Sequence, residues 1–296
     1  MDSVNTPAGA AKAFAQITEH LRRTAGLERK EATLADGTRY VYLEAGSGEP
    51  LVLLHGFGSN KDHFCRVAKE LSGPSGHQWR IIIPDHIGFG ESTHSPSLSG
   101  APSSQARRLN ELCQQLGMSR VHVGGSSMGG HIAMTWATLF PDMVASLWLL
   151  NPGGVWSAPA SEMRQRIRDT GRNLLVAHNV DEFRELMSMV VFQPVAATDA
   201  MLAAMGAERF ANVELEQQIF KELGSEPIEE RVKGLTTPTL IVWGKHDRVI
   251  HPDSAAILHG LLPNSQVILL DDIGHVPAME CPARVAEDYL RFRASL

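Results

Sequence analysis

The fold expected for this chain is decided by the stretch VHVGGSSMGG, residues 121–130. A short apolar run precedes its glycines, and a helical pattern extends from Met128 to Phe140. Residues 125–129 match the pattern Gly-x-Ser-x-Gly, which between a strand and a helix forms a nucleophile elbow. Because this turn is very tight, the serine takes strained backbone angles and only small neighbours fit. The stretch therefore predicts that Ser127 stands above a sheet, at a helix N-terminus whose dipole favours negative charge.

Apolar runs of the same kind recur on both sides of residues 121–130. Runs that are apolar on both faces are typical of parallel strands buried between two layers of helices. Helical patterns alternate with them, and this alternation predicts a doubly wound α/β sheet with right-handed crossovers. A turn at Asp36-Gly37, followed by strand-like residues to Gly46, indicates an additional hairpin. The predicted strands are 51–54, 80–83, 121–123, 145–150, 240–243 and 267–270, and the predicted helices are 61–71, 103–116, 128–140, 253–261 and 282–294.

The region from Gly153 to about Leu235 breaks the alternation, because its pattern is helical and holds no convincing strand. Since it lies between two predicted strands, we interpret it as a helical cap inserted over the carboxyl edge of the sheet. The predicted organisation is a core of residues 28–152 and 236–296, a cap of residues 153–235 and an N-terminal helical extension of residues 1–27. The predicted cap helices are 161–177, 181–190, 198–209 and 213–223.

Two features of these helical regions each have two interpretations. The methionines of the cap either line a flexible apolar pocket or fill the cap's own core. The N-terminal helix, residues 8–23, either packs on its own domain or lies against a membrane surface. The methionines are Met163, Met187, Met189, Met201 and Met205, and the apolar face of the N-terminal helix is formed by Ala11, Phe14, Ile17 and Leu21.

Two further residues follow predicted strands in the chain order that the elbow motif requires, which is Ser, then Asp, then His. Asp247 comes just after strand 240–243, and His275 comes just after strand 267–270. A serine hydroxyl becomes a nucleophile only with an adjacent base, itself oriented by a carboxylate. All three residues are expected at the same edge of the sheet, so the sequence predicts Ser127, Asp247 and His275 as a catalytic triad.

Two neighbouring candidates fit this pattern less well. Ser126 is followed two positions later by Met128 rather than by glycine. His246 precedes Asp247 and has no second acid behind it in the required order.

Acyl transfer also needs hydrogen-bond donors for the tetrahedral oxyanion. The elbow motif supplies one backbone N–H from the residue after the nucleophile, here Met128, and another from the loop after an earlier strand. That loop is HGFG, residues 55–58, whose glycines let the backbone turn its amides inward. Phe57 is therefore the expected second donor, and His55 is expected to be a structural hydrogen-bonding residue.

Composition excludes several classes of protein. The chain has 296 residues, with 27 Lys and Arg against 33 Asp and Glu, and this mild acidity offers no clustered positive field for nucleic acid. Cys65, Cys113 and Cys281 are far apart and lack metal-ligand spacing, so neither a disulfide framework nor a zinc site is expected. No cofactor or other metal is expected either. No run approaches the roughly 18 apolar residues of a spanning helix. The N-terminus lacks the pattern of a secretion signal, so a cytoplasmic location is expected, with peripheral membrane association left open.

The motifs together resemble those of the α/β-hydrolase superfamily over essentially the whole chain. Within it, LHGFGSNKDHF at 54–64, NPGGV at 151–155 and the helical cap resemble capped bacterial lipases and esterases related to membrane-associated monoacylglycerol lipases. The resemblance implies an α/β-hydrolase fold, a mostly parallel eight-stranded sheet flanked by helices with an inserted helical cap. It also implies that Ser127, Asp247 and His275 are the triad, with Phe57 and Met128 as oxyanion donors. The matching motifs are HGFG at 55–58, DHIGFGES at 85–92, GGSSMGG at 124–130, WGKHDRV at 243–249 and GHVPAMECP at 274–282.

The function expected from these residues is hydrolysis of carboxylic esters through an acyl-enzyme on Ser127. Short to medium acyl esters or monoacylglycerols are the expected substrates, because the cap is compact. A serine in the elbow argues against haloalkane dehalogenases and epoxide hydrolases, whose elbow carries Asp. Candidates for substrate contacts are His55, Asn151, Met187 and Val276. The partner is a small-molecule ester or lipid, and a monomer and a homodimer are both compatible with the sequence.

Three alternative functions remain at this point. Carbon–carbon bond hydrolases of ring-fission products share the fold, but their family pattern has an HGSGPG-like loop and a Trp after the catalytic His. Here the loop reads HGFGSN, and Val276 follows His275. A non-catalytic receptor of the same fold and an acyltransferase using the same acyl-enzyme are the other two.

Overall fold

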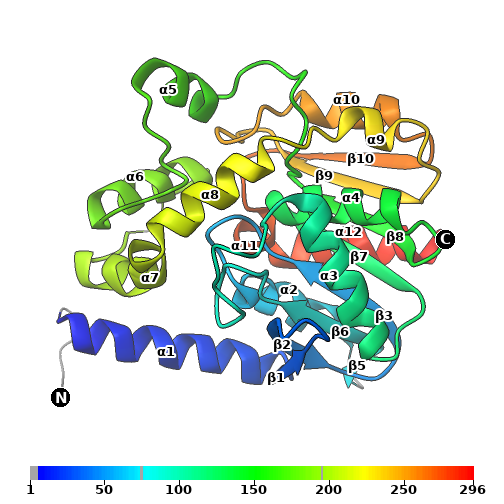
Figure 1. Ribbon diagram of the computed structural model, residues 1–296, viewed down its shortest axis with the longest axis horizontal. Coiled ribbons are helices and arrows are strands. Elements are labelled where there is room, and N and C mark those ends of the chain that lie inside the picture. Colours follow the sequence, from blue (N-terminus) through cyan, green and yellow to red (C-terminus); the bar gives the residue numbers. More distant parts are fainter. Residues whose placement is uncertain (1–5, 74–75, 195) are drawn as a thin grey trace.

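An eight-stranded sheet forms the centre of the computed structural model, which describes residues 6–73, 76–194 and 196–296 (Figure 1). Its strands are β1 (Glu28–Thr33), β2 (Arg39–Ala45), β3 (Glu49–Leu54), β6 (Trp79–Pro84), β7 (Val121–Ser126), β8 (Val144–Leu150), β9 (Thr239–Gly244) and β10 (Ser265–Leu270). Their order is β1-β2-β6-β3-β7-β8-β9-β10. Strand β2 is antiparallel to both of its neighbours, and the strands from β6 to β10 are parallel. The predicted sheet and hairpin are confirmed; β4 (Ser72–Gly73) and β5 (Gly76–His77) form a separate short pair.

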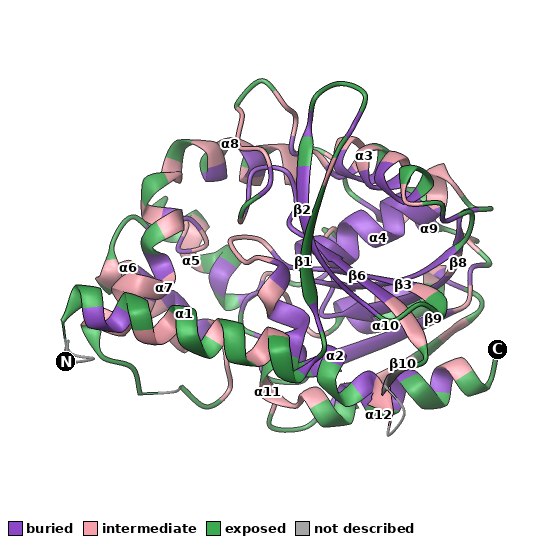
Figure 2. Ribbon diagram, turned by 90° about the horizontal axis from the view of Figure 1, so that it is seen from below, coloured by how far each residue is buried: buried purple, intermediate pink, exposed green. Residues whose placement is uncertain are grey.

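Helices cover both faces of the sheet. Successive side chains of a strand point to opposite faces and therefore enter two different apolar cores. In β3, Val52 and Leu54 belong to one core, whereas Leu51 and Leu53 belong to the other. Figure 2 shows that the central strands are buried and that the edge strand β1 is exposed. The first core is closed by α3 (Pro102–Gln115), α4 (Met128–Leu139) and α10 (Ser254–Leu261), and the second by α2 (Cys65–Leu71), α11 (Pro277–Glu280) and α12 (Pro282–Ala294).

The region between β8 and β9 is helical, and the structure shows no strand among its described residues. Its helices are α5 (Glu162–Thr170), α6 (Val180–Val190), α7 (Asp199–Ala211), α8 (Val213–Leu223) and α9 (Glu229–Val232). Helices α5 to α8 lie together beside the sheet (Figure 1). Helices α5, α6 and α7 form a small apolar core with Val249 of the loop after β9; it includes Met163 and Met189, with Met187 and Met205 packed against it.

One predicted helix of this region is shorter than expected. The spacing predicts a helix over 161–177, but α5 ends at Thr170. Gly171 follows with φ 69°, a left-handed conformation that caps a helix and that glycine adopts without steric cost. The prediction was wrong here because the apolar spacing continues past the glycine, although the backbone turns away at it.

The first helix, α1 (Pro7–Thr24), packs against α7 of the inserted region and against α2 of the core. Gly9 and Ala10 are its buried residues, and Arg22 forms a two-pronged ion pair with Asp62, with both N···O distances at 2.6 Å. In Figure 2, α1 runs along the lower surface with much of its length exposed. Among the described residues, none of the helices combines the length and apolar character needed to cross a membrane.

A buried ion pair joins two loops near the carboxyl edge of the sheet. Lys61 opens the 3-10 turn η1 (Lys61–Phe64), and its Nζ lies 2.7 Å from Oδ2 of Asp85. The backbone N–H of Lys61 donates to Oδ1 at 2.6 Å, and that of Glu91 donates to Oδ2 at 2.8 Å. Burial raises the pKa of Asp85, and the Lys61 ammonium opposes that shift. The loops after β3 and β6 are therefore fixed to one another through a single carboxylate.

Lys61→Met is expected to lower the free energy of unfolding by about 3–5 kcal/mol, because it leaves the buried Asp85 carboxylate without its cation. Urea denaturation followed by circular dichroism measures this loss. Arg168→Ala is the control, since Arg168 and its partner Asp169 are both exposed, and here the loss should stay below about 1 kcal/mol. Equal losses for the two variants would contradict the structural importance of the buried pair.

Candidate active site

Ser127 occupies the turn between β7 and α4 with φ 53° and ψ −116°, a strained conformation for a residue with a side chain. The glycines on either side are sterically required. A Cβ atom on Gly125 would lie 2.4 Å from the carbonyl oxygen of Gly129, and one on Gly129 would lie 2.1 Å from that of Leu54. The Ser127 N–H donates to the carbonyl oxygen of Leu150 at 3.0 Å. This is the geometry of a nucleophile elbow.

Asp247 and His275 form a buried pair on the loops that follow β9 and β10. The His275 ring places Nδ1 2.8 Å from Oδ2 of Asp247. Because a carboxylate only accepts hydrogen bonds, Nδ1 carries the proton and Nε2 is left as the free base. Oδ1 of Asp247 also accepts hydrogen bonds from the N–H groups of Val249 and Ile250, at 2.8 Å and 2.9 Å.

Ser127 lies at the same edge of the sheet as this pair, because β7, β9 and β10 are parallel. Within the described residues, no hydrogen bond joins Ser127 Oγ to the His275 ring. Catalytic hydrogen bonds are often long in proteins without substrate and shorten when the substrate binds. The structure thus joins two of the three predicted triad residues and holds the third at the end of β7, which is separated from β9 by β8.

The HGFG loop lies directly beside Ser127. A Cβ atom on Gly56 would lie 3.3 Å from Ser127 Cβ and 3.9 Å from its Oγ. Phe57 is half-buried, and its N–H has no acceptor among the described residues. Met128 is the first residue of α4, where backbone N–H groups lack a partner within the helix. Both predicted oxyanion donors are therefore placed next to the serine.

His55 is fully buried and holds this loop in place. Its Nδ1 donates to the carbonyl oxygen of Gly56 at 2.8 Å, and its Nε2 accepts from the N–H of His86 at 3.0 Å. Burial lowers the pKa of His55 well below its usual value, which agrees with a neutral ring that donates at one nitrogen and accepts at the other. His55 was a candidate for substrate contact, and the structure gives it a structural position instead.

Asn151, another candidate for substrate contact, is fully buried and touches the acid. Its Nδ2 donates to Asp247 Oδ2 at 2.6 Å and to the Gly274 carbonyl oxygen at 3.3 Å, and its Oδ1 accepts from the Gly244 N–H at 3.2 Å. It therefore connects the ends of β8, β9 and β10. The sequence signal was the position of Asn151 directly after a strand at the edge that also carries the acid.

The other two candidates for substrate contact are half-buried. Met187 lies on α6 and packs against the core of the inserted helices, and Val276 directly precedes α11. A further residue of this neighbourhood, Arg209 on α7, was not predicted from the sequence; its guanidinium lies against Gly58. No motif or spacing distinguishes it from the other arginines of the region.

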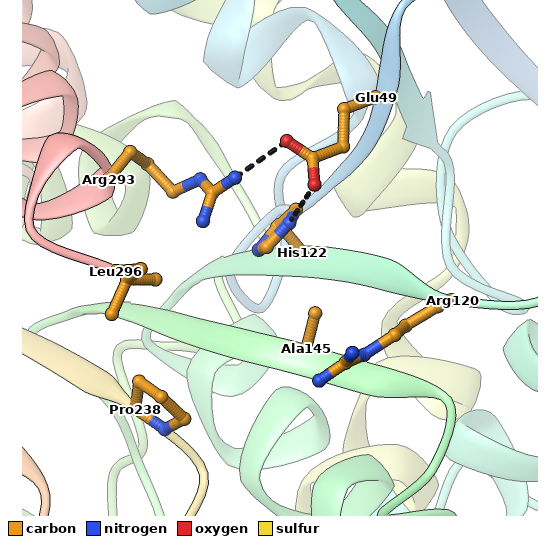
Figure 3. A pocket seen from close by; sticks show the side chains of 7 residues that line it. All are labelled: Glu49, Arg120, His122, Ala145, Pro238, Arg293 and Leu296. Atoms are coloured by element: carbon orange, nitrogen blue, oxygen red, sulfur yellow. Dashed lines mark hydrogen bonds and ion pairs between the residues drawn. The ribbon is translucent and has the colours of Figure 1, made fainter.

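One surface cavity borders Asp247, and a second lies away from the candidate catalytic residues. One, of about 360 Å³, is bordered by Val191, Phe192 and residues 245–248 and so includes Asp247. The other, of about 380 Å³, lies at the opposite edge of the sheet, where β3, β7 and β8 begin (Figure 3). Glu49 bridges His122 and Arg293 there. Among the described residues, no cluster of three His, Cys, Asp or Glu side chains is arranged to hold a metal ion.

Comparisons with known proteins point to one family. A family model described as the alpha/beta hydrolase fold matches residues 49–282. Lipase 1 of Psychrobacter immobilis is 38% identical over 287 residues, covering 95% of this chain and 89% of the relative. A monoacylglycerol lipase of Mus musculus is 27% identical, covering 93% and 85%. The crystal structure of a membrane phospholipase A, described as a bacterial virulence factor, superposes with a TM-score of 0.90 at 31% identity, covering 97% of this chain and 92% of the other.

Asn151→Ala is expected to lower the free energy of unfolding by about 1.5–3 kcal/mol, because a buried carboxylate loses a charge-assisted hydrogen bond. The variant should also weaken the low-field proton NMR signal of His275 Nδ1. Asn264→Ala is the control, since Asn264 is exposed and its amide donates only to the Thr236 carbonyl oxygen at 2.8 Å. A stability loss no larger than that of Asn264→Ala, with an unchanged proton signal, would contradict the assigned contact.

Proposed function

This chain belongs to the alpha/beta hydrolase fold family and hydrolyses carboxylic esters, and we propose that it does so through an acyl-enzyme formed on Ser127. The observation that supports this most is the strained Ser127 at the end of β7, at the same sheet edge as the His275–Asp247 pair. The relatives named as lipases and a monoacylglycerol lipase support the same class of reaction.

In the first half of the proposed reaction, Ser127 Oγ attacks the ester carbonyl carbon while His275 Nε2 takes the hydroxyl proton. Asp247 keeps the ring oriented and stabilises the imidazolium that forms. The carbonyl oxygen becomes an oxyanion and accepts hydrogen bonds from the N–H groups of Phe57 and Met128. The tetrahedral intermediate then collapses: the bond to the alcohol oxygen breaks, and His275 protonates the departing alcohol.

In the second half, water attacks the acyl carbon and His275 takes one of its protons. The same oxyanion donors stabilise the second tetrahedral intermediate. The bond between the acyl carbon and Ser127 Oγ breaks, His275 returns the proton to Ser127, and the carboxylic acid leaves. The N-terminus of α4 favours the negative charge that develops in both halves, because its first N–H groups and its dipole point at the site.

We propose that the acyl chain lies under the helices of residues 153–235, which act as the cap, and that short to medium acyl esters or monoacylglycerols are the substrates. Helices α5 to α7 form only a small apolar core, and the half-buried Met187 and Met205 packed against it are flexible enough to adapt to a chain. A compact cap limits the length of chain that it covers. The partner is accordingly a small ester or lipid molecule.

Ser127→Ala is expected to lower kcat for p-nitrophenyl butyrate by roughly 10⁴–10⁶-fold, because the covalent pathway loses its nucleophile. Steady-state release of p-nitrophenol measures the loss, and a fluorophosphonate probe should label the wild-type protein but not the variant. Ser126→Ala is the matched control, since Ser126 is buried and adjacent to Ser127 but does not occupy the nucleophile position of the elbow pattern. Equal turnover by Ser127→Ala and the wild type would reject the acyl-enzyme on this residue, and a wild-type protein without turnover would favour a receptor.

A series of p-nitrophenyl esters from acetate to palmitate should show kcat/KM rising over the short acyl chains and falling again before palmitate. Each methylene group buried under the cap contributes about 0.8 kcal/mol until the pocket is filled, which is close to fourfold per group. Product analysis with added alcohols in the same series distinguishes transfer to an alcohol from hydrolysis. An optimum at palmitate would contradict the proposed chain length.

A further inference from the structure

The segment Phe57-Gly58 is enclosed by side chains of the inserted helices. Phe57 stacks edge-on against Phe89 of the core, with ring centroids 5.4 Å apart, and against Phe220 of α8, at 5.8 Å. Gly58 has φ 65°, in the left-handed region that favours glycine. The loop proposed to stabilise the oxyanion is thus in contact with the core and with the inserted helices.

Arg209 of α7 lies directly against Gly58. A Cβ atom on Gly58 would lie 2.2 Å from Cζ of Arg209, 2.3 Å from Nη2 and 2.6 Å from Nε. The guanidinium therefore occupies the space that a side chain at position 58 would need. Cζ of Arg209 is also 5.9 Å from the centroid of the Phe57 ring, within the range of a cation–π interaction.

Arg209 is itself held in one orientation by a buried ion pair. Its Nε and Nη2 donate to the two carboxylate oxygens of Glu216 on α8, at 3.1 Å and 2.9 Å, and Nη2 also donates to the carbonyl oxygen of Leu175. Arg209 is 7% exposed and Glu216 is 2% exposed. A two-pronged pair with this little solvent access fixes the plane of the guanidinium, because any other orientation would leave a buried charge unpaired.

A second contact of the same helix is made by the preceding residue. Glu208 accepts a hydrogen bond from the Gly90 N–H at 2.5 Å, and its Oε1 lies 3.5 Å from Nε2 of His94. Hydrogen bonding to Glu208 raises the pKa of His94. Consecutive residues of α7 thus bind two different loops of the core, so α7 has little freedom to shift while both contacts are intact.

We propose that Arg209 is a positioning residue for the oxyanion loop: its guanidinium, oriented by Glu216, supports Gly58 and the Phe57 ring so that the Phe57 N–H points at the reacting oxygen. The proposal rests on the ester hydrolysis through Ser127 proposed above. Glu216 and Leu175 accept hydrogen bonds from Nε and Nη2 of Arg209, and the guanidinium packs against Gly58 and near the Phe57 ring. Its effect on the reaction is therefore transmitted through the loop.

The test compares Arg209→Met, Arg209→Lys and the wild type in steady-state hydrolysis of p-nitrophenyl acetate, a substrate too short to contact the cap helices extensively. Loss of one oxyanion donor costs about 10²–10³ in kcat, so a displaced donor should lower kcat by about 10–100-fold. KM should change little, because the contact matters chiefly in the transition state. Arg209→Lys keeps the charge without the two-pronged geometry and should give an intermediate kcat.

Hydrogen exchange measured by mass spectrometry supplies a readout that does not depend on turnover. The peptide that covers residues 55–60 should exchange faster in Arg209→Met than in the wild type, because the loop loses its support. Arg164→Met is the matched control: Arg164 also belongs to the inserted helices and lies 5.0 Å from the ring centroid of Trp156, but it is exposed. This control should leave kcat and the exchange of residues 55–60 unchanged.

Each outcome of this experiment decides the proposal. A kcat within about twofold of the wild type, or a rise in KM alone, would overturn it and leave Arg209 a structural residue of the inserted helices. If Arg209→Met does not fold, Arg209→Lys and Glu216→Gln are judged by the same criteria. A wild-type protein that hydrolyses no ester would instead reject the proposed function, and the exchange of residues 55–60 would then decide the contact alone.

Discussion

The steric constraint at the junction of β7 and α4 governs the architecture of this protein. A serine in the left-handed region costs of order 1–3 kcal/mol and persists only where the surrounding structure leaves no alternative. Here the Ser127 N–H is bound to Leu150, its carbonyl oxygen accepts from the Gly153 N–H at 2.8 Å, and the flanking glycines touch backbone on both sides. The strands β3, β7 and β8 must therefore be in register before the serine can take this position. The stability of the sheet is what maintains the strain.

Buried polar contacts extend this rigidity to the loops at the carboxyl edge. Asp85 binds the loop after β3 to the loop after β6, His55 joins the same two loops by a second route, and Asn151 joins the ends of β8, β9 and β10 around Asp247. An unpaired buried polar group costs about 1–3 kcal/mol, and more if it is charged. Each loop consequently has one favourable arrangement. The site is preorganised because its supporting groups have no satisfactory alternative partners.

Much of this arrangement could be predicted from the sequence, for a physical reason. Strands such as 51–54 and 240–243 are continuous apolar runs because both of their faces are buried, and residues that follow parallel strands must meet at one edge. The elbow glycines could be recognised because they directly follow a strand. Ser127, Asp247 and His275 could be recognised because each follows a strand of the same sheet. The end of a helix is harder to predict: apolar spacing does not reveal where the backbone turns away, as it does at Gly171.

The contacts of Asn151 and Arg209 could not be predicted from the sequence, because they join segments that are distant in the chain. The side chain of Asn151 could have pointed at a substrate or at the acid, and only the relative position of three strand ends decides between them. Arg209 is one of several arginines in a helical region, and nothing in its neighbours along the chain indicates that Gly58 lies opposite. Side-chain contacts between distant segments depend on packing angles that no local pattern encodes.

The packing of the inserted helices on the core links substrate binding to the chemistry of the site. The His275 N–H donates to the Val190 carbonyl oxygen at 2.8 Å, the Ser161 hydroxyl donates to that of Val249 at 2.7 Å, and Arg209 lies against Gly58. The first two contacts hold the proposed base and the loop of the proposed acid, and the third holds the proposed oxyanion loop. Any displacement of these helices that admitted a larger substrate would disturb at least one of the groups to which the proposed mechanism assigns the reaction. On the proposed mechanism, selection by acyl length and stabilisation of the transition state are therefore properties of the same set of contacts, because the helices proposed to cover the acyl chain also contact the groups proposed to cleave it.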